Sequence, residues 1–112
     1  MNKIILLLIT LTVSLSAEYL HYFGGQKEYL KQCWPCHKSS KVFVKQYTIA
    51  QWNNFMENNG TKLADIHLKS RDPEARALQP YFEGSRYLKK MKHLNAFLEH
   101  FAKDNNTSSA RQ

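Results

Sequence analysis

Two thiols and an imidazole stand close together in the stretch Cys33-Trp34-Pro35-Cys36-His37, which contains both cysteines of the chain. Two cysteines separated by two residues and followed by a histidine can serve three chemistries. They can form a redox-active dithiol, contribute part of a zinc site, or bind a haem through two thioether bonds and one iron–nitrogen bond. The surrounding residues decide between these possibilities.

A redox dithiol of the thioredoxin kind needs its first cysteine at the N-terminus of a helix, where the helix dipole lowers the pKa of the thiol. Its supporting fold is built from βαβ units. Here a helical pattern places Tyr29, Leu30 and Cys33 on one face, so the cysteines come at its C-terminal end. No βαβ pattern is found. A thiol–disulfide oxidoreductase that uses the CWPC pair is therefore the weaker alternative.

A structural zinc site needs four ligands, usually with a second pair of cysteines or histidines at matching spacing. His67, His93 and His100 are instead scattered singly along the chain. The haem interpretation uses all three reactive residues of the motif, because both thiols add to the haem vinyl groups and the histidine binds the iron. The motif therefore favours a covalently attached haem.

Residues 1–17 have the layout of a secretory signal peptide. Lys3 precedes the apolar run 4–13, and small residues follow up to Ser16 and Ala17. We expect cleavage after Ser16 or Ala17. The apolar run is shorter than the roughly 20 residues that span a bilayer, so we expect no stable membrane span after cleavage. Export to the periplasm agrees with haem attachment, which takes place outside the cytoplasm.

The rest of the chain has the length of one small domain, which we place at residues 18–104, followed by a flexible polar tail at 105–112. A domain of this size has a thin core, which a large apolar cofactor would fill. The net charge of the chain is +7. Its basic residues are not clustered with aromatics, which argues against a nucleic-acid surface. They form either a solvated face or a docking surface for an acidic partner.

Helical patterns dominate this domain, and we expect an all-α body of four or five short helices. The first helix should open at Gly24 and Gly25 and be ended near Trp34 by Pro35, with a loop at 39–46. The later signals are a capping box at Thr48–Gln51, a stop at Asn58–Gly60, a start at Asp72–Pro73, an end near Gln79–Pro80, and a last helix from Ser85 to about Lys103.

With these elements the chain resembles the small monohaem class I cytochromes c. Beside the CWPCH motif, Gly25, Tyr29 and Cys33 follow at four-residue steps, similar to the family's glycine, aromatic residue and first haem cysteine. The last helix resembles the family's C-terminal helix, and the resemblance implies that Gly25 permits a close approach of Phe97. The apolar stripe of this helix comprises Tyr87, Leu88, Met91, Leu94, Phe97, Leu98 and Phe101.

The resemblance implies a cytochrome c-like fold wrapped around one haem c. Cys33 and Cys36 would hold the haem as thioethers, and His37 would be the proximal iron ligand. The implied role is that of an electron carrier rather than an enzyme, with redox proteins and the haem-attachment machinery as partners. The expected apolar wall around the haem consists of Val42, Phe43, Trp52, Phe55, Leu63, Leu94 and Phe97.

The sixth iron ligand departs from the family's usual methionine, because Leu78 stands where that methionine is expected. The order Trp52, Met56, His67 resembles a stretch of bis-histidine cytochromes c. His67 also follows a helix break and shares a face with apolar residues. We therefore favour His67 as the distal iron ligand.

Met56 and Met91 are the alternative distal ligands, although each lies on an apolar stripe where core packing is its ordinary role. His93 and His100 flank the stripe of the last helix and fit solvated positions. If no side chain fills the distal position, an open iron could bind small ligands or peroxide. That haem protein is the second functional alternative.

Overall fold

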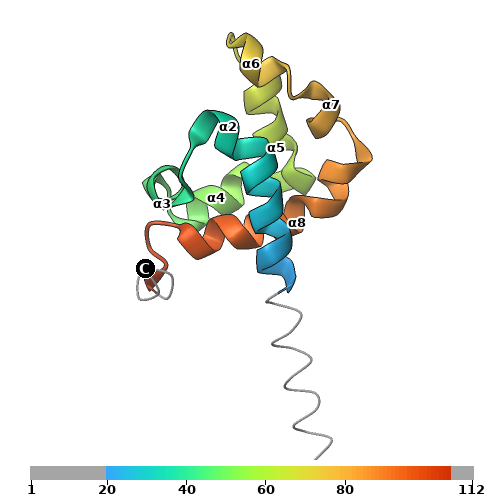
Figure 1. The fold of residues 1–112 in the computed structure, drawn as a ribbon. Helices are drawn as coiled ribbons and strands as arrows, with labels where there is room; N and C mark the ends of the chain where they lie inside the picture. Colours follow the sequence, from blue (N-terminus) through green and yellow to red (C-terminus); the bar gives the residue numbers. More distant parts are fainter. Residues whose placement is uncertain (1–19, 107–112) are drawn as a thin grey trace, which may run out of the picture.

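The computed structural model describes residues 20–106, and all regular secondary structure in this part of the chain is helical. The all-α prediction is therefore confirmed. The predicted signal peptide at 1–17 and the tail residues 107–112 lie outside the described residues. After an α-helical stretch at 20–28, the elements are the π-helical segment η1 (Tyr29–Cys33), α2 (Trp34–His37), α3 (Ser40–Phe43), the 3-10 helix η2 (Val44–Gln46), α4 (Ile49–Phe55), α5 (Glu57–Leu68), α6 (Pro73–Arg76), α7 (Gln79–Phe82) and α8 (Ser85–Phe101) (Figure 1).

The described residues form more helical segments than the four or five predicted, because several connections are themselves single helical turns. The expected loop at 39–46 contains α3 and η2. The expected helix end at Gln79–Pro80 is instead the start of α7, with the proline in its first turn. A proline suits this position because the first turn of a helix has no use for its N–H.

The first helix runs unbroken from residue 20 to His37 and changes its winding on the way. The N–H of Trp34 donates to the Tyr29 carbonyl, five residues earlier, which is the bond of a π turn. Pro35 then lies in the first turn of α2, where a missing N–H is tolerated. The prediction that Pro35 ends this helix is therefore wrong.

The first helix crosses α8 at its two glycines, which lie inside the helix rather than at its start. A Cβ atom on Gly25 would lie 2.0 Å from the carbonyl oxygen of His93 and 2.7 Å from the Cβ of Phe97. One on Gly24 would lie 2.4 Å from Nδ1 of His93. The close approach of Phe97 to Gly25 is thus confirmed, and it depends on the absence of a side chain at this position.

Helix α4 begins with the predicted capping box. The side chain of Thr48 accepts a hydrogen bond from the N–H of Gln51, and the Gln51 side chain accepts one from the N–H of Thr48. This reciprocal pairing satisfies two amide groups that have no partner within the helix. Trp52 is thereby oriented into the core, where its indole N–H donates to the Val44 carbonyl at 2.9 Å.

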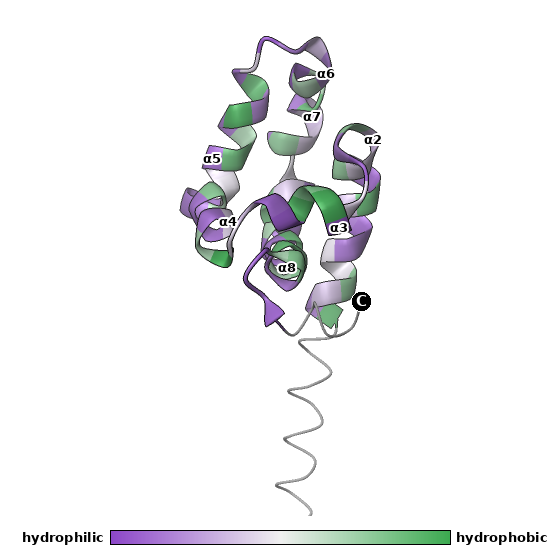
Figure 2. Ribbon diagram, turned by 90° about the vertical axis from the view of Figure 1, so that its left-hand side faces the viewer, coloured by the Kyte–Doolittle hydropathy of each residue, from purple (hydrophilic) through white to green (hydrophobic). Residues whose placement is uncertain are grey.

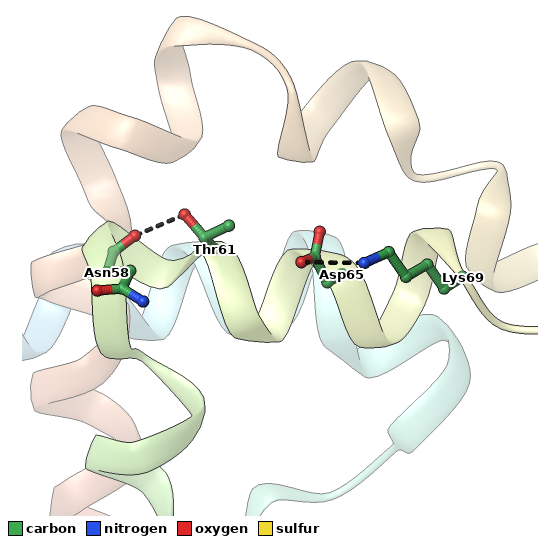
Figure 3. A network of polar contacts seen from close by, with 4 residues as sticks. All are labelled: Asn58, Thr61, Asp65 and Lys69. Atoms are coloured by element: carbon green, nitrogen blue, oxygen red, sulfur yellow. Dashed lines mark hydrogen bonds and ion pairs between the residues drawn. The ribbon is translucent and has the colours of Figure 1, made fainter.

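A left-handed turn separates α4 from the main part of α5 and lies at the helix stop predicted for Asn58–Gly60. Asn58, Asn59 and Gly60 all have positive φ values, of 55°, 57° and 76°. The chain then continues as a helix whose exposed side carries the hydrogen bond from Thr61 to the Asn58 carbonyl and the ion pair of Asp65 with Lys69 (Figure 3). This helix extends to Leu68 and is longer than the single turn expected around Leu63 and His67.

Helix α6 is capped by Asp72, whose carboxylate accepts from the N–H of Glu74 at 2.9 Å, as the sequence predicts. Helix α8 then packs against α4, α5 and α7 and closes the body. The helices carry hydrophobic and hydrophilic positions along their length, as Figure 2 shows, and the apolar sides meet inside. The buried core includes Tyr29, Val44, Trp52, Met56, Tyr87, Met91, Leu94, Phe97 and Leu98.

Three residues predicted to be buried lie at the surface instead. Leu88 is 63% exposed, although it belongs to the apolar stripe of the last helix. Val42, expected in the wall of the haem site, is 68% exposed because α3 turns it outward. Leu30, which the helical pattern groups with Tyr29 and Cys33, is also exposed within the π segment.

Candidate functional site

A cavity of about 270 Å³ lies between the helices, and each of α2 to α8 contributes to its wall. The predicted haem-binding residues Cys33, Cys36 and His37 line it, and so does the favoured distal ligand, His67. The two histidines are 30 positions apart in the sequence and come from different helices. The fold thus gathers the predicted site residues around one cavity.

The two thiols stand at the end of the first helix. Cys33 closes the π segment and is half-buried, whereas Cys36 is exposed in α2, and both are free thiols. Burial raises the pKa of the Cys33 thiol to about 12, with smaller contributions from the negative charges of Glu28 and Cys36. At neutral pH Cys33 is therefore a protonated thiol.

His37 ends α2 and lies flat against Phe43, with the ring centroids 3.9 Å apart and the planes at 15°. Burial lowers its pKa, and the neighbouring charge of His67 lowers it further. A neutral imidazole is the form that binds a metal ion. His37 is thus held in the protonation state that ligation needs.

The residue after His37 fixes the end of the helix in an unusual way. Lys38 has a φ of 61°, a value that favours glycine, and its N–H donates to the Trp34 carbonyl. Its own carbonyl accepts a hydrogen bond from the buried Tyr29 hydroxyl at 2.7 Å. Tyr29 therefore ties the chain next to the imidazole back to the preceding part of the same helix.

His67 is oriented by its own helix. Its Nδ1 lies 2.8 Å from the carbonyl oxygen of Leu63. Because a carbonyl oxygen can only accept, Nδ1 carries the proton, and the lone pair of the neutral ring is on Nε2. Hydrogen bonding of one ring nitrogen to a carbonyl is the usual way in which a metal-binding histidine is positioned. The ring also packs against Phe82, with centroids 4.8 Å apart.

The imidazole rings of His37 and His67 are near neighbours in the cavity. Their centroids are 6.2 Å apart, and their planes are nearly perpendicular, at 89°. The side chains that surround them are mostly apolar, and include Phe43, Trp52 and Leu94. Two nitrogen bases in an apolar surrounding are a suitable pair for a single metal centre.

The other candidate ligands lie elsewhere. Met56 and Met91 are buried in the core and do not belong to the cavity wall. His93 stacks on His21, with ring centroids 4.6 Å apart, at the crossing of the first helix with α8. His100 packs against Tyr22. None of these four candidates lines the cavity within residues 20–106.

Leu78, which replaces the expected methionine, does line the cavity. It contributes an apolar surface there and no ligand atom. Of the predicted apolar wall, the residues that line the cavity are Phe43, Trp52, Leu63 and Leu94. Phe55 and Phe97 pack within the core instead, and Val42 is exposed.

Two residues near the site, Glu28 and Tyr81, were not predicted from the sequence. Glu28 is buried on the first helix, and the hydroxyl of Tyr81 donates to its carboxylate at 3.1 Å. Tyr81 belongs to α7 and lines the cavity. The available signal was the position of Glu28, which lies three and four residues after the glycines and so shares their face of the helix.

Within the described residues, no three His, Cys, Asp or Glu side chains are grouped as a metal cluster would require. Nor does this part of the chain contain a helix long and apolar enough to cross a bilayer. Comparison of the chain with models of protein families, with curated proteins and with solved structures finds no match.

Proposed function

We propose that this protein is a periplasmic c-type cytochrome that carries single electrons between redox proteins. The observation that supports this proposal is the meeting of Cys33, Cys36, His37 and His67 around one mostly apolar cavity. Export rests on the signal peptide predicted at residues 1–17. When bound, the haem supplies a one-electron change of its iron, and the protein supplies binding, orientation and burial.

The residues present fit a haem iron. Cys33 and Cys36 would hold the cofactor, because the S–H of each free thiol could add across one vinyl double bond to give a carbon–sulfur bond without an oxidant. The ring centroids of His37 and His67 lie 6.2 Å apart, and their planes are nearly perpendicular. Both imidazoles would therefore be able to hold one iron.

The protein environment is suited to electron transfer. His37 is kept neutral by burial and is held flat by Phe43. The hydrogen bond from His67 to Leu63 leaves its Nε2 available. Apolar side chains such as Trp52, Leu78 and Leu94 line the cavity, while Cys36, which also belongs to its wall, is exposed. An electron can enter and leave at such an exposed edge.

A thiol–disulfide oxidoreductase is less well supported. That chemistry depends on a thiol whose pKa is lowered, because the thiolate is the nucleophile. The pKa of Cys33 is instead raised to about 12. The cysteines also stand at the C-terminal end of the first helix, where the helix dipole does not favour a thiolate.

The test is to express the full chain in a host with haem-attachment machinery and to isolate the exported form. We expect its mass to exceed that of the processed polypeptide by one haem, and its reduced and oxidised absorption spectra to be those of a c-type cytochrome. A Cys33→Ala/Cys36→Ala variant, made in the same host, is the matched control. A colourless wild-type protein with the mass of its amino acids alone would contradict the proposal.

A further inference from the structure

Among residues 20–106, Glu28 is the one charged residue that is buried, with 1% of its surface exposed. Burial of an ionised carboxylate is unfavourable unless it is paired and hydrogen-bonded. Glu28 has both kinds of partner. Nη2 of Arg86 in α8 lies 2.8 Å from its Oε1, and the hydroxyl of Tyr81 in α7 donates to its Oε2.

The two charges of this pair stand in different surroundings. The side chain of Arg86 is 54% exposed, whereas that of Glu28 is 1% exposed. Solvent screens an exposed charge much more strongly than a buried one. Although the pair is formally neutral, its electrostatic effect on the interior is therefore dominated by the negative charge.

The negative charge lies next to the wall of the cavity. Tyr81, which is bonded to the Glu28 carboxylate, lines the cavity, and so does Cys33. The charge of Glu28 contributes to the raised pKa values of both side chains. The field of this carboxylate thus extends to one of the two sulfur atoms predicted to hold the haem.

Stability alone does not account for such a pair. Replacement of a buried ion pair by apolar residues of similar size is often neutral or stabilising. A fixed negative charge beside the cavity has a different effect, because it favours the more positive of two states of a nearby redox centre. The oxidised iron carries one more positive charge than the reduced iron, and charge and burial around a haem set its reduction potential.

We propose that Glu28, held beside the cavity by Tyr81 and Arg86, is a tuning residue that lowers the reduction potential of the haem iron. The inference rests on the proposed function, because it needs a haem attached at Cys33 and Cys36. It assigns a role to a carboxylate that neither binds the cofactor nor lines the cavity.

The test is a redox titration of the haem-loaded wild type and of variants at this pair. With Glu28→Gln we expect the ratio of reduced to oxidised haem at a fixed potential to rise about tenfold, which is about 59 mV for a one-electron couple. With Arg86→Gln we expect a change of opposite sign, because the carboxylate loses its positive partner. Arg86→Lys should restore a value near that of the wild type. Glu57→Gln, at an exposed carboxylate that is not part of the cavity wall, is the matched control.

The opposite signs distinguish tuning from a general disturbance of the structure. A common shift in both Gln variants, or no shift in either, would overturn the inference. If Glu28→Gln fails to retain haem, the reduction potentials of Arg86→Gln and Arg86→Lys still test the inference. Only Arg86→Gln removes the positive charge, so its potential should be the lower of the two, and equal potentials would overturn the inference. An exported wild type without haem would overturn the proposed function itself, and this outcome is seen in the mass before any titration begins.

Discussion

The imidazoles of His37 and His67 lie 6.2 Å apart, centroid to centroid, although they belong to the different helices α2 and α5. The hydrogen bond from Nδ1 of His67 to Leu63 leaves the opposite ring nitrogen as the basic one. This relationship makes His67 the side chain most suitably placed to be the second iron ligand beside His37 in the proposed haem site.

Replacement of His67 by alanine should therefore convert a low-spin haem into a high-spin haem that binds carbon monoxide rapidly in the ferrous state. Absorption spectra of the oxidised, reduced and carbon monoxide-treated protein measure this change. His100→Ala, at a histidine that packs against Tyr22 away from the cavity, should leave the spectrum unchanged. A low-spin spectrum that survives in His67→Ala would reject His67 as a ligand. Rapid binding of carbon monoxide by the wild type would support the alternative with an open distal site.

The state of the two cysteines gives a second prediction. Both are unpaired thiols in the fold, and thioether formation consumes both. Thiol titration of the denatured, exported wild type should therefore find no reactive thiol. Cys33→Ala and Cys36→Ala should each retain one thioether, and the double variant should give no haem stain on a denaturing gel. Detection of two free thiols in the coloured wild-type protein would show that its haem is not bound through sulfur.

The crossing of the first helix with α8 gives a prediction about stability. Gly25→Ala would bring a methyl group to 2.0 Å from the His93 carbonyl oxygen, so the two helices would have to separate. Overpacking of this kind lowers the free energy of unfolding by about 1–3 kcal/mol. The better helix propensity of alanine raises it again by about 1 kcal/mol. We expect a net decrease in the free energy of unfolding, measured by denaturant titration.

Gly24→Ala is the matched comparison for that variant. Its added methyl group would meet the side chain of His93 rather than backbone. In a His93→Ala background the Gly24→Ala substitution should therefore become tolerated, whereas Gly25→Ala should remain destabilising. If His93→Ala restored the stability of the Gly24→Ala and Gly25→Ala variants equally, the backbone contact at Gly25 would be contradicted.

The same crossing should make stability depend on pH. Burial lowers the pKa of His93, and the nearby charges of His21 and Lys90 lower it further, against a smaller opposing effect of Glu28. The unfolded chain, in which this pKa has its ordinary value of about 6.5, then binds more protons than the folded one as the pH falls below that value. The free energy of unfolding should accordingly decrease on acidification below about pH 6.5.

Denaturant titrations at pH 7.5 and pH 5.5 measure this effect. His93→Gln should lose less stability between the two pH values than the wild type, because glutamine does not titrate. His100→Gln serves as the control for removal of a histidine from the same helix. A pH dependence in His93→Gln equal to that of the wild type would mean that another group causes the loss.

The local signals of the sequence predicted the local features of the fold. The capping box of Thr48, the cap of Asp72 and the left-handed turn at Asn58–Gly60 each depend on a few consecutive residues, and each is found. The contact of Gly25 with Phe97 was also predicted, from a family resemblance. These features need no knowledge of how distant segments pack.

Features that depend on the winding of the first helix were not predicted. The helical pattern groups Leu30 with Tyr29 and Cys33, but this stretch is a π segment in which Tyr29 is buried and Leu30 is exposed. The burial of Glu28 was not predicted either, because its partners Tyr81 and Arg86 are more than 50 positions away in the sequence. The spacing of apolar residues in the sequence shows neither where an α-helix changes to π winding nor which distant residue supplies the opposite charge.

The part of the candidate site that lies within one short motif could be predicted, whereas the part that depends on distant segments was harder to predict. Cys33, Cys36 and His37 follow from one short motif, whereas the proximity of His67 depends on the path of the chain through α5. Its role as a ligand remains a prediction. No signal in the sequence indicated that Lys38 would adopt a positive φ, because the chain has no glycine at this helix end.

The π turn at Tyr29–Cys33 has one further consequence, for the angular relation between the two ends of the first helix. Each residue of an α-helix turns the chain by about 100°, so a turn that holds one residue more offsets all that follows it. The glycine end can therefore fit the groove of α8 while the cysteine end points at the cavity. Deletion of the exposed residue Leu30 would restore uniform α-helical winding. It would thereby turn Cys33 and Cys36 away from the cavity that they now line.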